Sequence, residues 1–195
     1  MMKTVKTSVI AILSLTILLG LAYPLVMTGI SVALFPGNSH GSLIKVDGKT
    51  IGSKLIAQDF AGKPEYFQSR PSATGYAGDA TYFSNAGPNS EDYKVELQKR
   101  ADVYLKREGR FDKGLTREDI PSSAVQTSAS GVDSGISPAD ARIQAHRVAE
   151  VRGLPLDRVM ALVDDNTQGR GLGIFGEPAV NVLQLNLDLD QEVAK

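Results

Sequence analysis

The chain has 195 residues, with 21 Lys and Arg against 22 Asp and Glu, so its formal net charge is −1. This near balance excludes a nucleic-acid-binding protein held by bulk positive charge. The absence of Cys excludes disulfides, zinc ribbons, iron–sulfur sites and cysteine nucleophiles. Two histidines, His40 and His146, are too few for a multi-histidine metal site. We therefore expect no metal and no stably bound cofactor.

The N-terminal segment is strongly apolar. Residues 7–44 contain no Asp, Glu, Lys or Arg, and about 20 apolar residues in a helix cross the roughly 30 Å of hydrocarbon in a bilayer. We therefore expect a cytoplasmic N-terminus over 1–6, a single transmembrane helix over 7–35 in contact with membrane lipid, and a linker over 36–44. Pro24 removes one backbone hydrogen bond and crowds the preceding turn, which predicts a kink.

A cleaved signal peptide is the alternative interpretation, because the sequence from Ser31 to Ala33 resembles a cleavage site. The apolar core of a signal peptide spans about 7–15 residues, however, and this run is far longer, which favours an uncleaved anchor. Lys3 and Lys6 precede the span and favour a cytoplasmic N-terminus. Long domains cross the membrane largely regardless of charge, so we expect residues 45–195 to lie outside the cytoplasm.

Small residues in the span indicate where neighbouring helices could approach. Thr16 and Gly20 are four positions apart, as are Gly29 and Ala33, and such small-xxx-small pairs allow close backbone contact. The alternative is that Gly and Ala are simply common in membrane helices. The positions predicted to pack against other subunits are Thr16, Gly20, Tyr23, Pro24, Gly29 and Ala33.

The segment after the linker begins with a hairpin pattern. Asp47 and Gly48 separate two short apolar runs, and this dipeptide is a strong signal for a two-residue β-turn. Residues 53–60 extend the second strand in this interpretation. Residues 61–90 are rich in Gly, Pro, Ser and Asn but contain interleaved aromatic residues. The aromatic content favours an ordered irregular segment over disorder.

Helices and strands then follow without regular alternation. Asn89 or Ser90 caps a predicted helix that ends at Gly109, and residues 124–128 read as a strand.

Ser137, followed by a proline, starts a helix that runs to residue 151 and stops at Gly153. A second helix is expected over 156–165, and residues 183–189 alternate like a half-buried strand. This order favours an α+β domain over 45–195.

The candidate chemistry is weak. The Gly171–Gly176 segment matches G-x-G-x-x-G, but neither a strand before it nor a helix after it supports a dinucleotide site. His146 is the one base available in this region and reads as a surface or half-buried side chain. A serine–lysine hydrolase remains an alternative, although the adjacent Ser53 and Lys54 would point apart in a strand. Gln144 is a weak candidate for a nucleotide contact, and a helix-surface position is favoured.

Several short motifs, in order along the chain, give it a family resemblance. Tyr23-Pro24-Leu25 lies in the span, residues 66–73 match the pattern YFxxRPSA, and residues 127–133 resemble TASGSGLD, with Val in place of Leu. The chain resembles the KdpC family, the small C subunits of prokaryotic Kdp-type potassium-transporting ATPases. The residues outside the span that carry the resemblance are Tyr66, Phe67, Arg70, Pro71, Ser72, Asn85, Gly131, Asp133, Gly176, Glu177, Asn181 and Asn186.

The resemblance implies a non-catalytic, single-pass accessory subunit of the prokaryotic cell (inner) membrane. Its partners would be a potassium-channel-like subunit, a P-type ATPase subunit that hydrolyses ATP, and a very small membrane subunit. Members have been viewed as catalytic chaperones that raise ATP affinity in a transient complex. Because ATP is cytoplasmic and the domain is expected outside, an assembly clamp or a cover near the ion entrance fits the topology better. A free-standing anchored enzyme or binding protein is the alternative.

Overall fold

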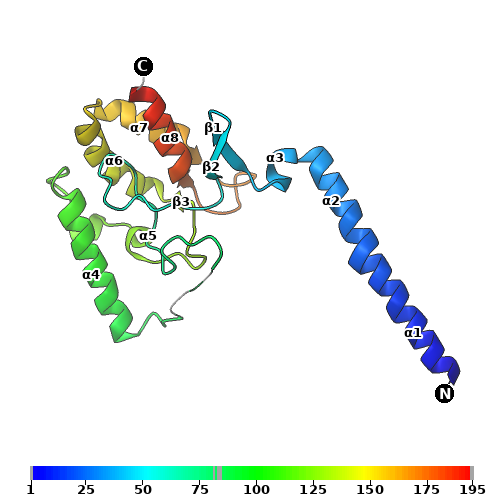
Figure 1. The fold of residues 1–195 in the computed structure, drawn as a ribbon. Helices are drawn as coiled ribbons and strands as arrows, with labels where there is room; N and C mark the ends of the chain where they lie inside the picture. Colours follow the sequence, from blue (N-terminus) through cyan, green and yellow to red (C-terminus); the bar gives the residue numbers. More distant parts are fainter. Residues whose placement is uncertain (1, 81, 83–84, 194–195) are drawn as a thin grey trace. The chain divides into compact units, whose positions relative to one another are not determined.

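The computed structural model describes residues 2–80, 82 and 85–193, and these form two compact units that divide between Ser53 and Lys54. The first unit holds the apolar helix and a hairpin, and the second holds the remaining helices and a small sheet (Figure 1). The expected class is confirmed: one N-terminal apolar helix precedes an α+β domain. The hairpin belongs to the first unit, whereas we had predicted that the domain begins at residue 45.

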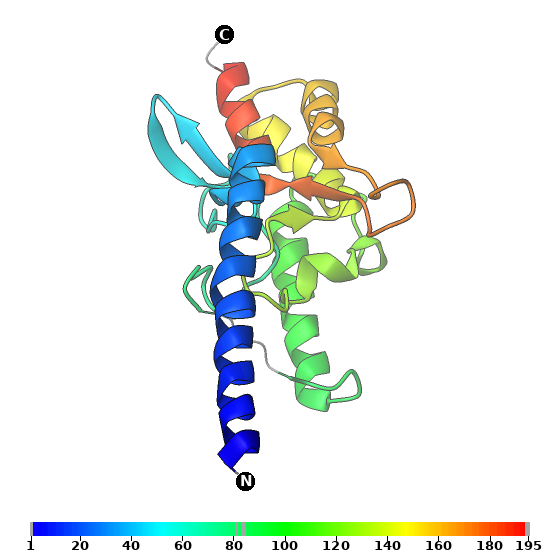
Figure 2. The same cartoon turned by 90° about the vertical axis from the view of Figure 1, so that its right-hand side faces the viewer.

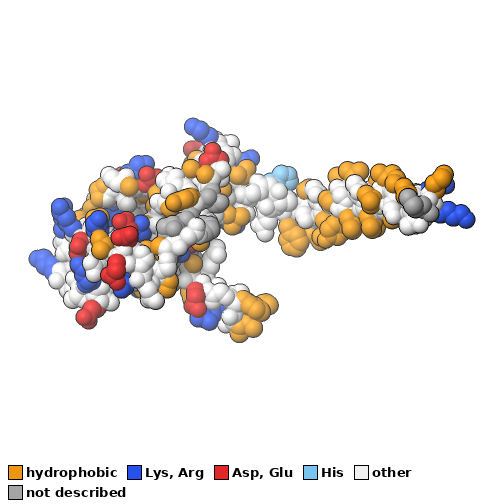
Figure 3. Space-filling model, turned by 90° about the horizontal axis from the view of Figure 1, so that it is seen from below, with side chains coloured by type: hydrophobic (Ala, Val, Ile, Leu, Met, Phe, Trp, Pro, Cys, Tyr) orange, Lys and Arg blue, Asp and Glu red, His pale blue; other side chains and the backbone are white. Residues whose placement is uncertain are grey.

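The apolar helix is longer than predicted and contains a widened turn. It consists of α1 (Met2–Ile17), a π-helical turn (Leu18–Ala22) and α2 (Tyr23–Leu34), and its most apolar 18-residue window has a mean hydropathy of 2.4. No part of that window is buried against the rest of the chain. Figure 3 shows hydrophobic side chains along the helix and basic ones near its N-terminal end.

The widened turn lies directly before Pro24. The Tyr23 N–H donates to the Leu18 carbonyl five residues back, which is the π pattern. Pro24 has no N–H, and its ring would clash with the Gly20 carbonyl in a regular α-helix. The disturbance expected at Pro24 therefore takes the form of a wider turn.

The hairpin is formed by β1 (Leu43–Val46) and β2 (Lys49–Ser53) and follows the short helix α3 (Pro36–Ser39) in the expected linker. Asp47 and Gly48 have φ values of 49° and 77°, as a type I′ turn requires. The turn prediction is confirmed. The extension over residues 53–60 is wrong, because β2 ends at Ser53.

The second unit packs helices around a three-stranded antiparallel sheet with strand order β3-β5-β4 (Figure 2). The two caps predicted at Ser90 and Ser137 are present, and Gly153 ends its helix in the left-handed conformation. The elements are α4 (Glu91–Glu108), α5 (Ser122–Val125), β3 (Gly135–Ile136), α6 (Pro138–Arg152), α7 (Leu156–Asp165), β4 (Thr167–Gln168), β5 (Ala179–Asn181) and α8 (Val182–Val193), with a 3₁₀ turn at Arg117–Asp119.

The core lies where α6, α7 and α8 meet β5. The predicted apolar face of α6 is confirmed, because Ala141, Ala145, Val148 and Ala149 are all buried. The three predicted inward residues of α7 are also buried: Val159, Leu162 and Val163. Phe67, from the irregular segment, is fully buried beside α8.

Neither of the segments predicted as strands after the hairpin, 124–128 and 183–189, is a strand. The segment 183–189 lies within α8, where Val182, Leu185 and Leu189 are buried at helical spacing. A seven-residue alternation of leucines is compatible with the two-residue repeat of a strand and with the 3.6-residue repeat of a helix. Packing against α7 favours the helix. Residues 122–125 form the single turn of α5, started by Pro121 and closed by the Gln126 N–H on the Ser122 carbonyl.

Candidate functional site

Arg147 on α6 is the centre of a buried polar network in the second unit. Its side chain is 1% exposed, and its Nε donates to Glu108 Oε2 at 3.0 Å. One terminal nitrogen donates to the Tyr66 carbonyl at 2.9 Å and to the Pro64 carbonyl, and the other donates to Gln144 Oε1 at 3.0 Å. A single guanidinium thus joins α4, α6 and the irregular segment.

The charge of Arg147 is balanced inside the protein. Burial lowers its pKa, and the adjacent Glu108 opposes that shift. Glu108 is itself fully buried and also accepts a 2.5 Å hydrogen bond from Arg107 Nε. Such a pair is costly to desolvate, and removing one partner leaves a buried charge. The network therefore holds the irregular segment in place rather than offering a free cation.

Gln144 is buried at 1% exposure, so the helix-surface position that we favoured is wrong. Its Oε1 accepts from the Gln68 N–H at 2.8 Å, and its Nε2 donates to the Gln68 carbonyl at 3.2 Å and to Asp140 Oδ1 at 3.0 Å. The amide therefore pairs with the backbone of residue 68 as a neighbouring strand would. A nucleotide would reach this amide only by displacing these partners.

Asn186 on α8 pairs with the next residue of the same segment. Its Oδ1 accepts from the Phe67 N–H at 2.8 Å, and its Nδ2 donates to the Phe67 carbonyl at 3.0 Å. Two amides from two helices thus satisfy consecutive backbone groups that belong to no sheet. This explains structurally why an irregular segment with a Tyr-Phe pair stays ordered.

Tyr104 and Asp140 extend the network to the start of α6. The Tyr104 hydroxyl donates to Asp140 Oδ1 at 2.6 Å, and both groups are buried. Burial raises the pKa of Tyr104 and also raises the pKa of Asp140, although hydrogen bonds from Tyr104 and Gln144 act against the latter shift.

The other residues of the family motifs also hold loops together. Arg70 pairs with Asp133 at 2.8 Å, and the Ser72 hydroxyl donates to the Gly131 carbonyl at 2.6 Å. Gly131 has a φ of +75°, and a Cβ there would lie 2.6 Å from Thr74 Oγ1. Four further motif residues also bind other parts of the domain: the Pro71 carbonyl accepts from the Ser128 N–H, Asn181 donates to the Lys54 carbonyl, Tyr66 donates to Asp190, and Glu177 binds Arg170. The last two, Gly176 and Asn85, have a positive φ.

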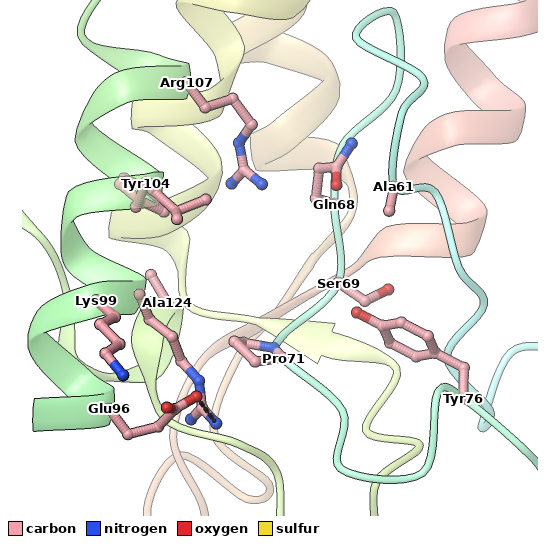
Figure 4. Close-up of a pocket in the computed structure, with 12 residues that line it drawn as sticks. Ala61, Gln68, Ser69, Pro71, Tyr76, Glu96, Lys99, Tyr104, Arg107 and Ala124 are labelled. Atoms are coloured by element: carbon pink, nitrogen blue, oxygen red, sulfur yellow. Dashed lines mark ion pairs between the residues drawn. The ribbon is translucent and has the colours of Figure 1, made fainter. Parts of the chain in front are cut away.

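A cavity of about 380 Å³ lies between α4 and the irregular segment. Figure 4 shows Tyr104 and Arg107 of α4 facing Gln68 and Ser69 across it. The Ser69 and Tyr76 hydroxyls donate to backbone carbonyls, and Arg100 pairs with Glu96 at 3.0 Å. The walls carry cations but no nucleophile–base pair that meets the geometric requirements of catalysis.

The remaining chemical candidates are also accounted for. His146 is half-buried, as predicted. The Ser53 hydroxyl is buried and donates to the Gly41 carbonyl at 2.7 Å, so it is not poised as a nucleophile beside Lys54. Over residues 2–80, 82 and 85–193, the structure has no cluster of three Asp, Glu or His side chains that could hold a metal ion.

One candidate membrane span precedes a small α+β domain in which buried polar side chains hold the loops in place. These features define the class of membrane-associated proteins with a single apolar helix and one small folded domain. The family model described as "K+-transporting ATPase, c chain" matches residues 5–191, which include nearly all of the apolar helix. The chain belongs to the KdpC family, and the resemblance seen in the motifs is confirmed.

Curated relatives match over nearly the whole chain. The protein from Caldanaerobacter subterraneus subsp. tengcongensis is 45% identical over 193 residues, covering 99% of this chain and 97% of the relative. The one from Caulobacter vibrioides is 47% identical over 97% of this chain and 94% of the relative, and the one from Bradyrhizobium diazoefficiens is 43% identical over all of both chains. Each is named "Potassium-transporting ATPase KdpC subunit". The alternative of a free-standing enzyme finds no support in these matches.

Proposed function

We propose that the chain is a non-catalytic accessory subunit of an ATP-driven potassium uptake complex. The family match over residues 5–191, span and domain together, carries this proposal. The structure of the domain supports it, because the buried Arg147–Glu108 pair and the amides of Gln144 and Asn186 are used to order the chain. ATP hydrolysis belongs to another subunit in this proposal.

The proposed topology is a single pass with the N-terminus in the cytoplasm and the second unit outside. Lys3 and Lys6 at the start of the helix support this orientation. The proposed partners are a potassium-channel-like subunit, a P-type ATPase subunit and a small membrane subunit. With the domain outside, any rise in the ATP affinity of the hydrolysing subunit would have to be transmitted through subunit contacts in a transient complex.

Two experiments test the proposal. Native mass spectrometry of gently solubilised membranes should find the chain bound to larger membrane proteins, whereas a stable monomer alone would contradict it. Protease added from each side of sealed vesicles should cut the second unit from the outer side only. Cleavage from the cytoplasmic side would overturn the topology and reopen direct contact with ATP.

A further inference from the structure

The loop between β4 and β5 exposes three large apolar side chains. Leu172 is 91% exposed, Ile174 is 70% exposed and Phe175 is 64% exposed. Figure 2 shows this loop projecting from the sheet, and Figure 3 shows a protruding group of hydrophobic side chains with an acidic and a basic group beside it. We call these three side chains the apolar tip. Contiguous exposed apolar groups of this kind mark interaction sites.

The apolar tip is held in one shape by its own backbone. Gly171 and Phe175 exchange two backbone hydrogen bonds, at 2.7 and 2.9 Å, and the Gly173 N–H donates to the Arg170 carbonyl at 3.0 Å. Leu172 has a φ of +51°, which is a strained backbone conformation for a bulky residue, and its side chain is almost fully exposed. At the base, Arg170 binds both carboxylate oxygens of Glu177, at 2.9 and 2.7 Å.

We propose that the apolar tip inserts into an apolar socket on a partner protein subunit of the transport complex, and this rests on the proposed function. A preformed tip loses little conformational entropy on binding, and aromatic and aliphatic anchors that fill a pocket dominate protein interfaces. The Arg170–Glu177 pair then lies at the rim of the interface, where polar groups are typical.

The local charges favour a protein over a lipid surface. Segments that lie on membranes combine apolar side chains such as Trp, Phe or Leu with several Lys or Arg that attract anionic headgroups. Residues 168–178 contain one basic residue, Arg170, whose charge is neutralised by Glu177, and no Lys, Trp or Tyr. The rim of the tip therefore has no net attraction for anionic headgroups.

A second copy of this chain offers no matching socket among the cavities that we describe in the second unit. Each of these cavities has charged residues in its wall. The cavity between α4 and the irregular segment has Lys99 and Arg107, and the one at the start of α4 has Asp92 and Arg100. The cavity near α6 has Asp112 and Arg142, and the one near β5 has Lys54 and Asp165. An apolar tip would take such charges out of water without offering them any new hydrogen-bond partner. A different subunit is the occupant that fits.

The absence of Cys allows a direct test. The variant Ile174→Cys carries one thiol, which is spin-labelled before the full-length chain is reconstituted with the partner subunits in lipid. Collision of the label with oxygen reports lipid, and collision with a water-soluble nickel complex reports solvent. The matched control is Val103→Cys on α4, where the native side chain is 65% exposed.

We expect both collision rates at position 174 to fall several-fold once the complex forms, while the label at position 103 keeps its contact with the nickel complex. Unchanged nickel collisions at position 174 would overturn the inference, because the tip would still be in water. A rise in oxygen collisions with a loss of nickel collisions would also overturn it, because the tip would then lie in lipid.

Substitution gives a second measurement. Phe175→Ser and Ile174→Ser should each weaken binding of the chain to the partner subunits about tenfold or more, while Val103→Ala should leave it unchanged. Thermal unfolding of the domain should not change, because the tip side chains are solvent-exposed. If the unaltered chain binds and both variants bind equally well, this inference fails alone. If the unaltered chain does not bind, the proposed function fails.

Discussion

The Arg147 guanidinium holds three parts of the domain together with a hydrogen-bonding geometry that a lysine could not reproduce. Its planar fork reaches a carboxylate on α4, a side-chain amide on its own helix and two carbonyls of the irregular segment. Lys has one nitrogen and no such fork, so an Arg-to-Lys change at this position is not conservative.

Arg147→Met tests the cost of breaking this network. The change leaves the fully buried Glu108 without its main partner, and we expect a loss of about 3–5 kcal/mol in the free energy of unfolding. Urea titration of the full-length chain in detergent, followed by tyrosine near-ultraviolet circular dichroism, measures it. The matched control is Arg142→Met on the same helix, which breaks the exposed pair with Asp164 and should cost about 0.5 kcal/mol or less. Equal losses in the two variants would contradict the central role of Arg147.

Asp140 predicts a pH dependence of stability with a definite sign. Burial raises its pKa above the ordinary value of 3.8, so the folded state holds the proton more tightly than the unfolded chain does. Its contribution to stability is therefore full below about pH 3.8 and is lost as pH rises through the folded-state pKa. Asp140→Asn has no such titration, so wild type should lose stability relative to the variant as the pH rises above about 3.8 and through the raised folded-state pKa. A constant or opposite difference in urea unfolding would contradict the assignment.

The residue contacts of the site were only partly predictable from sequence. Asp140, Gln144 and Arg147 recur at helical spacing, so their shared face on α6 could be inferred. Their partners could not, because Glu108 lies in a highly charged stretch that indicates solvent exposure, and Gln68 lies 76 residues from Gln144. Long-range pairing of polar groups leaves no periodic signal.

At the scale of elements, predictions succeeded where local chemistry dictates the outcome. The Asp47–Gly48 turn, the serine caps of α4 and α6 and the stop at Gly153 all rest on interactions within a few residues. They failed at 124–128 and 183–189, where the residue pattern is too short to distinguish a helix from a strand. There, tertiary packing decided, and α8 became a helix because its leucines meet α7 and β5.

Gly153→Ala tests how much the α6 stop depends on backbone conformation alone. Gly153 has a φ of +66° at the end of α6, and a Cβ there would meet no atom within 4 Å. We expect a loss of about 1 kcal/mol in the free energy of unfolding, which comes from the left-handed conformation and not from a clash. Gly169→Ala is the matched control, because its Cβ also has open space but its φ lies outside the left-handed range. If the two variants unfold at the same urea concentration, the conformational account is wrong.

For the whole molecule, hydropathy and motif order were the informative signals. The long run without charges predicted the span, and motifs spread from Tyr23 to Asn186 predicted the family that the comparison over residues 5–191 confirms. Contacts with partner proteins could not be predicted from hydropathy or motif order, because the residues of a binding surface do not recur at a regular spacing in the sequence. The two candidate surfaces identified are the small-residue faces of the span and the apolar tip.

The small residues of the span lead to a prediction for assembly. A Cβ at Gly29 would meet no atom within 4 Å, and one at Gly20 would meet only Thr16 Cγ2, at 3.9 Å. A leucine at either position is therefore tolerated within the chain itself, so any loss must arise where a partner helix approaches closely. We expect Gly20→Leu or Gly29→Leu to lower the yield of assembled complex severalfold, while the amount and helicity of the chain itself stay constant. Thr28→Leu, which adds bulk at a neighbouring position of the same helix, is the control and should assemble normally. Unchanged yield of complex in both glycine variants, measured by native mass spectrometry, would show that neither face contacts a partner.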